Sequence, residues 1–89
     1  MPIKYDIDTT NQTETIFRYI LSDGDLEEAI TYGKILPKSF EKLLNNTKNA
    51  KFWCSTIGMK LSAKLIAEII SQCDLREDFL LEFFDCLTV

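Results

Sequence analysis

Histidine is absent from this chain of 89 residues, and its absence limits the reactions that the side chains could carry out. Without an imidazole there is no Ser–His or Cys–His nucleophile pair and no general base that titrates near neutral pH. The three glycines are isolated from one another, so no glycine-rich loop can hold a phosphate group. Capping of helix starts and solvation of helix faces account for most of the carboxylates. The composition therefore predicts a protein that is not an enzyme and uses no cofactor.

The remaining candidate nucleophiles and metal ligands are three cysteines, Cys54, Cys73 and Cys86. They are odd in number and lie 19 and 13 residues apart, which fits neither a disulfide framework nor a metal-ligand spacing. A calcium-binding loop beginning at Asp6 fails, because its twelfth place is Phe17 rather than a bidentate glutamate. The sequence thus predicts buried free thiols and no metal site.

The charges are divided along the chain into three blocks. Residues 1–33 carry a net charge of −5, residues 34–64 carry +6, and residues 65–89 carry −5, which sum to the total of −4. Two interpretations remain open for the lysine-rich centre. The acidic flanks could neutralise it within one fold, or it could remain positive for a partner.

The segment that leads into this centre resembles a helix-turn-helix motif. Ala29 and Gly33 have the spacing of that motif's small residue and turn glycine, and a helix carrying lysines follows. The apolar residues Phe40 and Leu43, however, come one place later than the motif requires, so an ordinary helical hairpin is favoured. If nucleic acid is bound, lysine and asparagine side chains would contact phosphates and base edges. These candidate residues are Lys34, Lys38, Lys42, Asn45, Asn46, Lys48 and Lys51.

Two adjacent aromatic residues lie within the lysine-rich centre. Helical spacing puts Trp53 on the same side as Ala50 and Ile57, which predicts that Trp53 faces the core and Phe52 faces outward. An exposed Phe52 beside lysines could stack on bases of single-stranded nucleic acid. It could equally anchor a protein interface, because aromatic residues are enriched there.

The last predicted helix combines apolar and acidic residues. Its apolar stripe, Phe79, Leu80, Phe83, Phe84 and Leu87, is expected first to cover the core of this small domain, but it could instead exceed what one small core can cover. Phe83 or Phe84 could then face a partner, and the neighbouring acids would favour a basic partner. The residues that we expect to bind a partner are Phe52, Asp78, Glu82, Phe83, Phe84 and Asp85.

Hydrophobic periodicity and helix-start signals predict an all-α fold, a compact bundle of four to five short helices. Residues 1–10 are expected to form an irregular N-terminal arm, and residues 11–89 a single helical domain. Asn11, Asp25 and Asp74 each precede a glutamate by three residues and are expected to cap helices. Glycine is expected to end the first two helices, in left-handed conformation at Gly24. Gly58 is expected to break or kink a short helix before a longer one that starts at Met59.

The sequence is most typical of a small acidic, non-enzymatic protein-binding module, acting as a regulator, inhibitor or adaptor on a larger protein partner. That partner could be basic or handle nucleic acid. The alternatives are a nucleic-acid-binding domain that uses residues 34–64, or a homo-oligomerisation domain, for example a homodimer. No apolar run is long enough to span a bilayer and no signal-peptide core is present, so we expect a cytoplasmic protein without a membrane partner.

Overall fold

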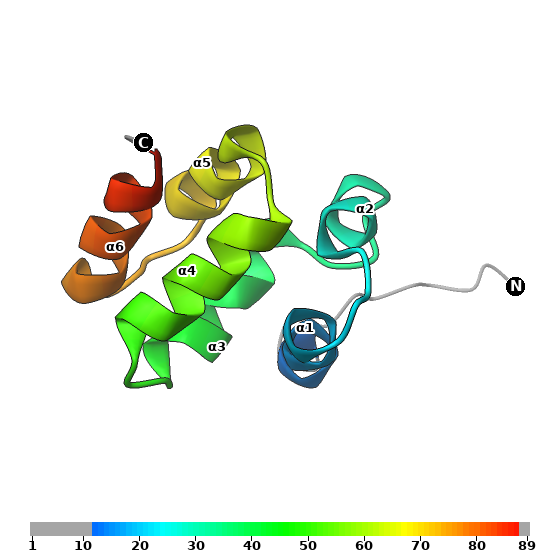
Figure 1. The fold of residues 1–89 in the computed structure, drawn as a ribbon, viewed down its shortest axis with the longest axis horizontal. Coiled ribbons are helices and arrows are strands. Elements are labelled where there is room, and N and C mark those ends of the chain that lie inside the picture. Colours follow the sequence, from blue (N-terminus) through cyan, green and yellow to red (C-terminus); the bar gives the residue numbers. More distant parts are fainter. Residues whose placement is uncertain (1–11, 88–89) are drawn as a thin grey trace, which may run out of the picture.

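The computed structural model describes residues 12–87, which contain six α-helices, one 3₁₀ helix and no strand (Figure 1). The all-α prediction is confirmed, although the described residues form six short α-helices rather than the four or five that were expected. The N-terminal arm and the Asn11 cap lie outside the described residues. In chain order the helices are α1 (Gln12–Leu21), α2 (Leu26–Thr31), η1 (Pro37–Ser39), α3 (Phe40–Asn45), α4 (Ala50–Lys60), α5 (Ala63–Gln72) and α6 (Glu77–Leu87).

Local capping explains both ends of α2. The carboxylate of Asp25 accepts a hydrogen bond from the Glu28 amide at 2.9 Å, which confirms this predicted N-cap. At the other end Gly33 has a φ of 74°, and its amide bonds to the Ile30 carbonyl at 3.0 Å. The Lys34 amide bonds to the Ala29 carbonyl at 2.8 Å, which completes a Schellman motif. Gly33 therefore ends α2 as predicted.

Gly24 has a different role from the predicted one. Gly33 is the glycine with positive φ in the described part of the chain, so Gly24 is not left-handed. Instead it lies against the ring of Tyr19, where an added Cβ would be 2.7 Å from the Cδ1 atom. A close approach, not a backbone conformation, therefore favours glycine at this position.

The boundaries of the last three helices differ from the expected ones. Helix α4 continues through Gly58 to Lys60, and α5 starts only after the Ser62 hydroxyl caps the Leu65 amide at 3.4 Å. Helix α6 begins at Glu77, so Asp74 is not its cap. The Asp74 amide instead donates to the carboxylate of Glu41 at 2.7 Å. The residues around Asp74, which were expected to begin the last helix, are thus held by a hydrogen bond to a distant residue instead.

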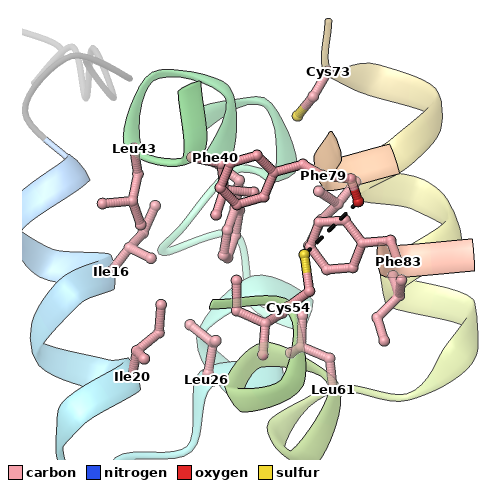
Figure 2. Packing of buried hydrophobic residues seen from close by; sticks show 14 of the residues in the cluster. Ile16, Ile20, Leu26, Phe40, Leu43, Cys54, Leu61, Cys73, Phe79 and Phe83 are labelled. Carbon is pink, nitrogen blue, oxygen red and sulfur yellow. Dashed lines mark hydrogen bonds between the residues drawn. The ribbon is translucent and has the colours of Figure 1, made fainter. Parts of the chain in front are cut away.

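The core is one cluster of buried side chains to which all the helices contribute, with α4 at its centre. Helix α4 packs mainly on α6 and also on α1. Figure 2 shows Phe40, Phe79 and Phe83 gathered on one side of Cys54, with Ile16 and Ile20 of α1 on the other. Burial of this apolar surface is the main stabilising contribution to the fold.

Two amides tie distant segments together. Gln12 is buried, and its side chain donates to the Lys34 carbonyl at 2.9 Å and accepts from the Leu36 amide at 3.0 Å and from the Ser39 hydroxyl. Asn45 donates to the Asp74 carbonyl at 2.9 Å and accepts from the Arg76 amide at 3.0 Å. These bonds fix α1 to the segment before α3, and α3 to the segment before α6.

Candidate protein-docking surfaces

Three aromatic rings from α1 and α4 contact one another at the surface. The centroid of Trp53 lies 5.5 Å from that of Phe17 and 5.5 Å from that of Phe52. Phe17 is 41% exposed and Phe52 is 47% exposed, whereas Trp53 is partly buried against the core. Leu21, one turn after Phe17, is also exposed. We call these four residues the aromatic surface.

On α1 and α4 the residues of the aromatic surface lie next to the buried side chains of the same helix. Ile16 and Ile20 of α1 point into the core, so Phe17 and Leu21, each one residue later, emerge at its edge. On α4 the buried residues include Cys54, which turns Phe52 outward. The sequence identified Phe52 as a candidate but not Phe17, because apolar periodicity within α1 does not show which of its two apolar rows faces the core.

The charges next to the aromatic surface are unequal at its two ends. Lys48 and Lys51 are exposed at the start of α4, whose first turn contains no acidic residue. The positive end of the helix dipole lies at the same place. On α1 the exposed Glu14 carboxylate is paired with Arg18 at 3.0 Å. The edge of the surface beside α4 is therefore positive.

The outer side of α6 is a second exposed apolar area. Leu81 is 61% exposed and Phe84 is 49% exposed, one turn apart. Asp78 and Asp85 lie on the same side of the helix as Leu81, whereas Glu82, two residues before Phe84, is half-buried and lies away from it. We call the whole set the acidic face of α6. Its residues are Asp78, Leu81, Glu82, Phe84 and Asp85.

Phe83 does not belong to this face. Its side chain is fully buried in the core beside Phe79, so it is removed from the expected binding residues. The physical reason is the crossing of α6 over α4, which directs the Phe79 and Phe83 row inward and the Phe84 row outward. Of the two candidates on the last helix, Phe84 is the one available to a partner.

Arg76 keeps one carboxylate of the acidic face ionised. Its guanidinium donates to both oxygens of Asp78, at 3.1 and 3.0 Å, and lies 4.8 Å from the ring centroid of Phe79. Hydrogen bonding from Arg76 lowers the pKa of the Asp78 carboxyl. Asp85 is exposed and Glu82 is half-buried. This face is thus negative at neutral pH.

The lysines of the chain's centre remain outside contact ion pairs. Both ion pairs within residues 12–87 involve an arginine, either Arg18 or Arg76. Six of the seven nucleic-acid candidates are exposed, namely Lys34, Lys38, Lys42, Asn46, Lys48 and Lys51. The seventh, Asn45, is occupied by its bonds to the segment before α6. Carboxylate contacts therefore do not neutralise the positive centre.

A helix-turn-helix does not form around Gly33. Residues 32–36 and the 3₁₀ helix η1 separate α2 from α3, and α3 has six residues. Helix α3 packs on α1. Lys34 therefore lies on the connection, Lys38 in η1 and Lys42 in the six-residue helix α3, and this arrangement provides no long exposed recognition helix.

Two cysteine thiols are held in the core. Burial, with nearby Cys86 as a smaller cause, raises the pKa of Cys54 to about 12, and its thiol faces the Phe79 carbonyl at 3.8 Å. Burial likewise raises the pKa of Cys73 to about 11. Both thiols are protonated at neutral pH, the form that is poorly nucleophilic. Within residues 12–87 no group of three or more Cys, Asp or Glu side chains could hold a metal ion.

An open groove of about 610 Å³ lies between α2 and α5. Ile30, Leu36 and Leu65 contribute apolar surface to it, and Glu27 lies at its edge. The Glu27 carboxylate accepts from the Ser62 amide at 2.7 Å, at the start of α5. Glu27 therefore stabilises the helix junction and is not a free ligand-binding group.

None of the helices in the described range is long and apolar enough to cross a membrane. Comparisons with protein-family models, with curated proteins and with solved structures found no match.

Proposed function

We propose that this protein is a small acidic, non-enzymatic binding module that docks the acidic face of α6 on a larger protein. The observation that carries the proposal is the exposure of Leu81 and Phe84 among carboxylates. Apolar side chains surrounded by a charged rim are typical of interaction sites. The three free cysteines support a cytoplasmic location as part of the same proposal.

The partner that this face fits is a basic protein with an apolar pocket. Phe84 would be the anchor, because aromatic residues at the centre of an interface contribute most of the binding energy. Glu82 and Asp85 would attract lysine or arginine side chains of the partner, whereas the charge of Asp78 is already compensated by Arg76. Such attraction mainly accelerates association and is weakened by salt.

The test is affinity purification of the tagged protein from its native cells, with and without nuclease, followed by quantitative mass spectrometry. The informative variant is the double substitution Leu81→Ser with Phe84→Ser. The matched control is Phe17→Ser with Phe52→Ser, which also removes two half-exposed apolar side chains. A stoichiometric partner that survives nuclease and is lost only in the α6 variant supports the proposal. Equal recovery with the α6 variant and the wild type contradicts it.

Nucleic-acid binding is the second candidate, and the exposure of five lysines outside ion pairs favours it. Binding of this kind weakens steeply as salt is raised, because phosphate contacts release counterions. Fluorescence anisotropy with a labelled single-stranded oligonucleotide measures it directly. If changing Lys38, Lys42 and Lys48 together to glutamate leaves all function intact, this candidate is excluded.

Self-association through α6 is the remaining alternative. Because Phe84 is half-exposed, Phe84→Glu is expected to leave the protein folded. Analytical ultracentrifugation of the wild type and this variant measures whether each is a monomer or a dimer. A wild-type dimer that becomes a folded monomer in the variant would assign the face to a second copy of the chain.

A further inference from the structure

We infer that the aromatic surface of α1 and α4 is a second binding site, which takes an acidic amphipathic helical segment of a partner protein. This site is distinct from the acidic face of α6 in position, composition and charge. A chain with both sites would connect two partners, one basic and one acidic. The inference does not depend on the proposed role of α6.

The apolar part of the site is one continuous area across two helices. Trp53 lies between Phe17 and Phe52, with both ring pairs 5.5 Å apart, and Leu21 extends the area along α1. Met59, two turns after Phe52, extends it along α4 and is almost fully exposed. Helices α1 and α4 cross steeply (Figure 1), so Leu21 and Met59 extend the area in different directions. The apolar stripe of an amphipathic helix, with side chains at intervals of three and four, would cover the rings of Phe17 and Phe52 where the two helices meet.

The charges argue that the occupant is acidic. Lys48 and Lys51 lie beside Phe52 at the positive end of the α4 dipole, and no acidic residue occupies that first turn. Lysines at a helix start are unfavourable for the helix itself, so carboxylates of a partner would relieve the repulsion. Glu14 adds no uncompensated negative charge, because Arg18 pairs with it.

The opposite end of the site gives the occupant a direction. There the Lys60 ammonium donates to the Ser22 carbonyl at 2.8 Å, and Asp23 is exposed. This end therefore offers less positive charge than the start of α4. The acidic end of the bound segment should lie over Lys48 and Lys51.

A protein segment fits this site better than single-stranded nucleic acid. The ring of Phe52 meets Trp53 edge-on, with an interplanar angle of 84°, so these rings are packed together and not laid out as parallel platforms for bases. Among the described residues, Lys48 and Lys51 are the exposed lysines nearest to Phe52 in the chain, and two lysines would neutralise few phosphates.

The two sites can be occupied together. Figure 1 shows α4 between α6 and α1, and α4 packs on both of them. The acidic face is on the outer side of α6, whereas the aromatic surface lies where α1 meets α4. A partner on one site would therefore not cover the other.

Trp53 allows a direct test because it is the single tryptophan of the chain. Its emission would be followed during titration with a synthetic helical peptide that has leucines at helical spacing and glutamates elsewhere. The control peptide carries lysines in place of the glutamates. We expect a saturable shift in emission with the acidic peptide, weakened by salt, and little change with the basic one.

Substitutions then locate the site. Lys48→Glu with Lys51→Glu should weaken peptide binding about tenfold or more, the equivalent of roughly 1.4 kcal/mol. The matched control, Lys38→Glu with Lys42→Glu, makes the same change in net charge elsewhere and should leave affinity within about twofold of the wild type. Phe52→Ser should abolish binding, whereas Phe84→Ser should not. Circular dichroism confirms that each variant is folded.

Four results of the peptide and oligonucleotide titrations would overturn the inference. They are no saturable binding of the acidic peptide, equal binding of the basic peptide, equal weakening by the control lysine pair, and a larger emission shift with oligothymidylate than with peptide. A shift that depends on protein concentration alone, and that Leu81→Ser with Phe84→Ser removes, would also overturn it. That result would make α6 of a second copy the occupant.

Discussion

At the scale of single residues, the side chain of Gln12 makes more tertiary hydrogen bonds than its place at the start of α1 suggests. It is buried and bonds to Lys34, Leu36 and Ser39, all of which lie before α3. Gln12→Ala leaves a buried amide, a carbonyl and a hydroxyl without these partners. We expect the free energy of unfolding to fall by about 1–3 kcal/mol, measured by urea denaturation.

Gln72→Ala is the matched control, because Gln72 is an exposed glutamine at a helix end. Its effect should stay within about 0.5 kcal/mol. Equal losses of stability in the two variants would show that the bonds of Gln12 do not stabilise the fold.

At the scale of helices, Gly58 lies where α4 packs closely on α6, but the packing leaves room for a larger residue than glycine. An added Cβ would lie 3.4 Å from the Sγ atom of Cys86, an ordinary van der Waals contact. Gly58→Ala should therefore raise the free energy of unfolding by about 0.5–1 kcal/mol, because alanine favours the helix. Thermal and urea denaturation measure the change.

The same substitution at Gly33 should act in the opposite direction. Nothing lies within 4 Å of a Cβ added there, but the φ of 74° disfavours any L side chain. Gly33→Ala should lower the free energy of unfolding by about 1–2 kcal/mol. If Gly58→Ala and Gly33→Ala changed the free energy of unfolding in the same direction, the backbone conformation of the two glycines would not explain their effects on stability.

At the scale of the whole molecule, α4 joins the α1 side of the core to the α6 side. Ile57 is fully buried at this junction. Ile57→Ala should lower the free energy of unfolding by about 2–5 kcal/mol. Because one core includes all the helices, Trp53 fluorescence and far-ultraviolet circular dichroism should report the same midpoint.

Met59→Ala is the control, since Met59 lies on the same helix and is exposed. It should change stability by less than about 0.5 kcal/mol. Separate midpoints for fluorescence and circular dichroism would mean that the α1 side and the α6 side unfold independently, which one shared core does not allow.

The amino-acid sequence by itself determined the all-α class and several helix ends. The Asp25 cap and the Gly33 stop follow from bonds between residues close in the chain, so they are independent of the rest of the fold. Apolar periodicity predicted most of the helices, because it also depends only on residues that are close in the chain. The Asp74 start was wrong because its amide bonds to Glu41, a distant residue.

Tertiary structure alone decided which row of each double apolar stripe is buried. Neighbouring residues on a helix differ by about 100° around its axis, so a stripe of two rows can face the core through either one. The packing of α6 on α4 buried Phe83 and left Phe84 exposed, and that of α1 brought Phe17 to Trp53. These orientations depend on contacts between helices far apart in the chain, which periodicity along one helix does not contain.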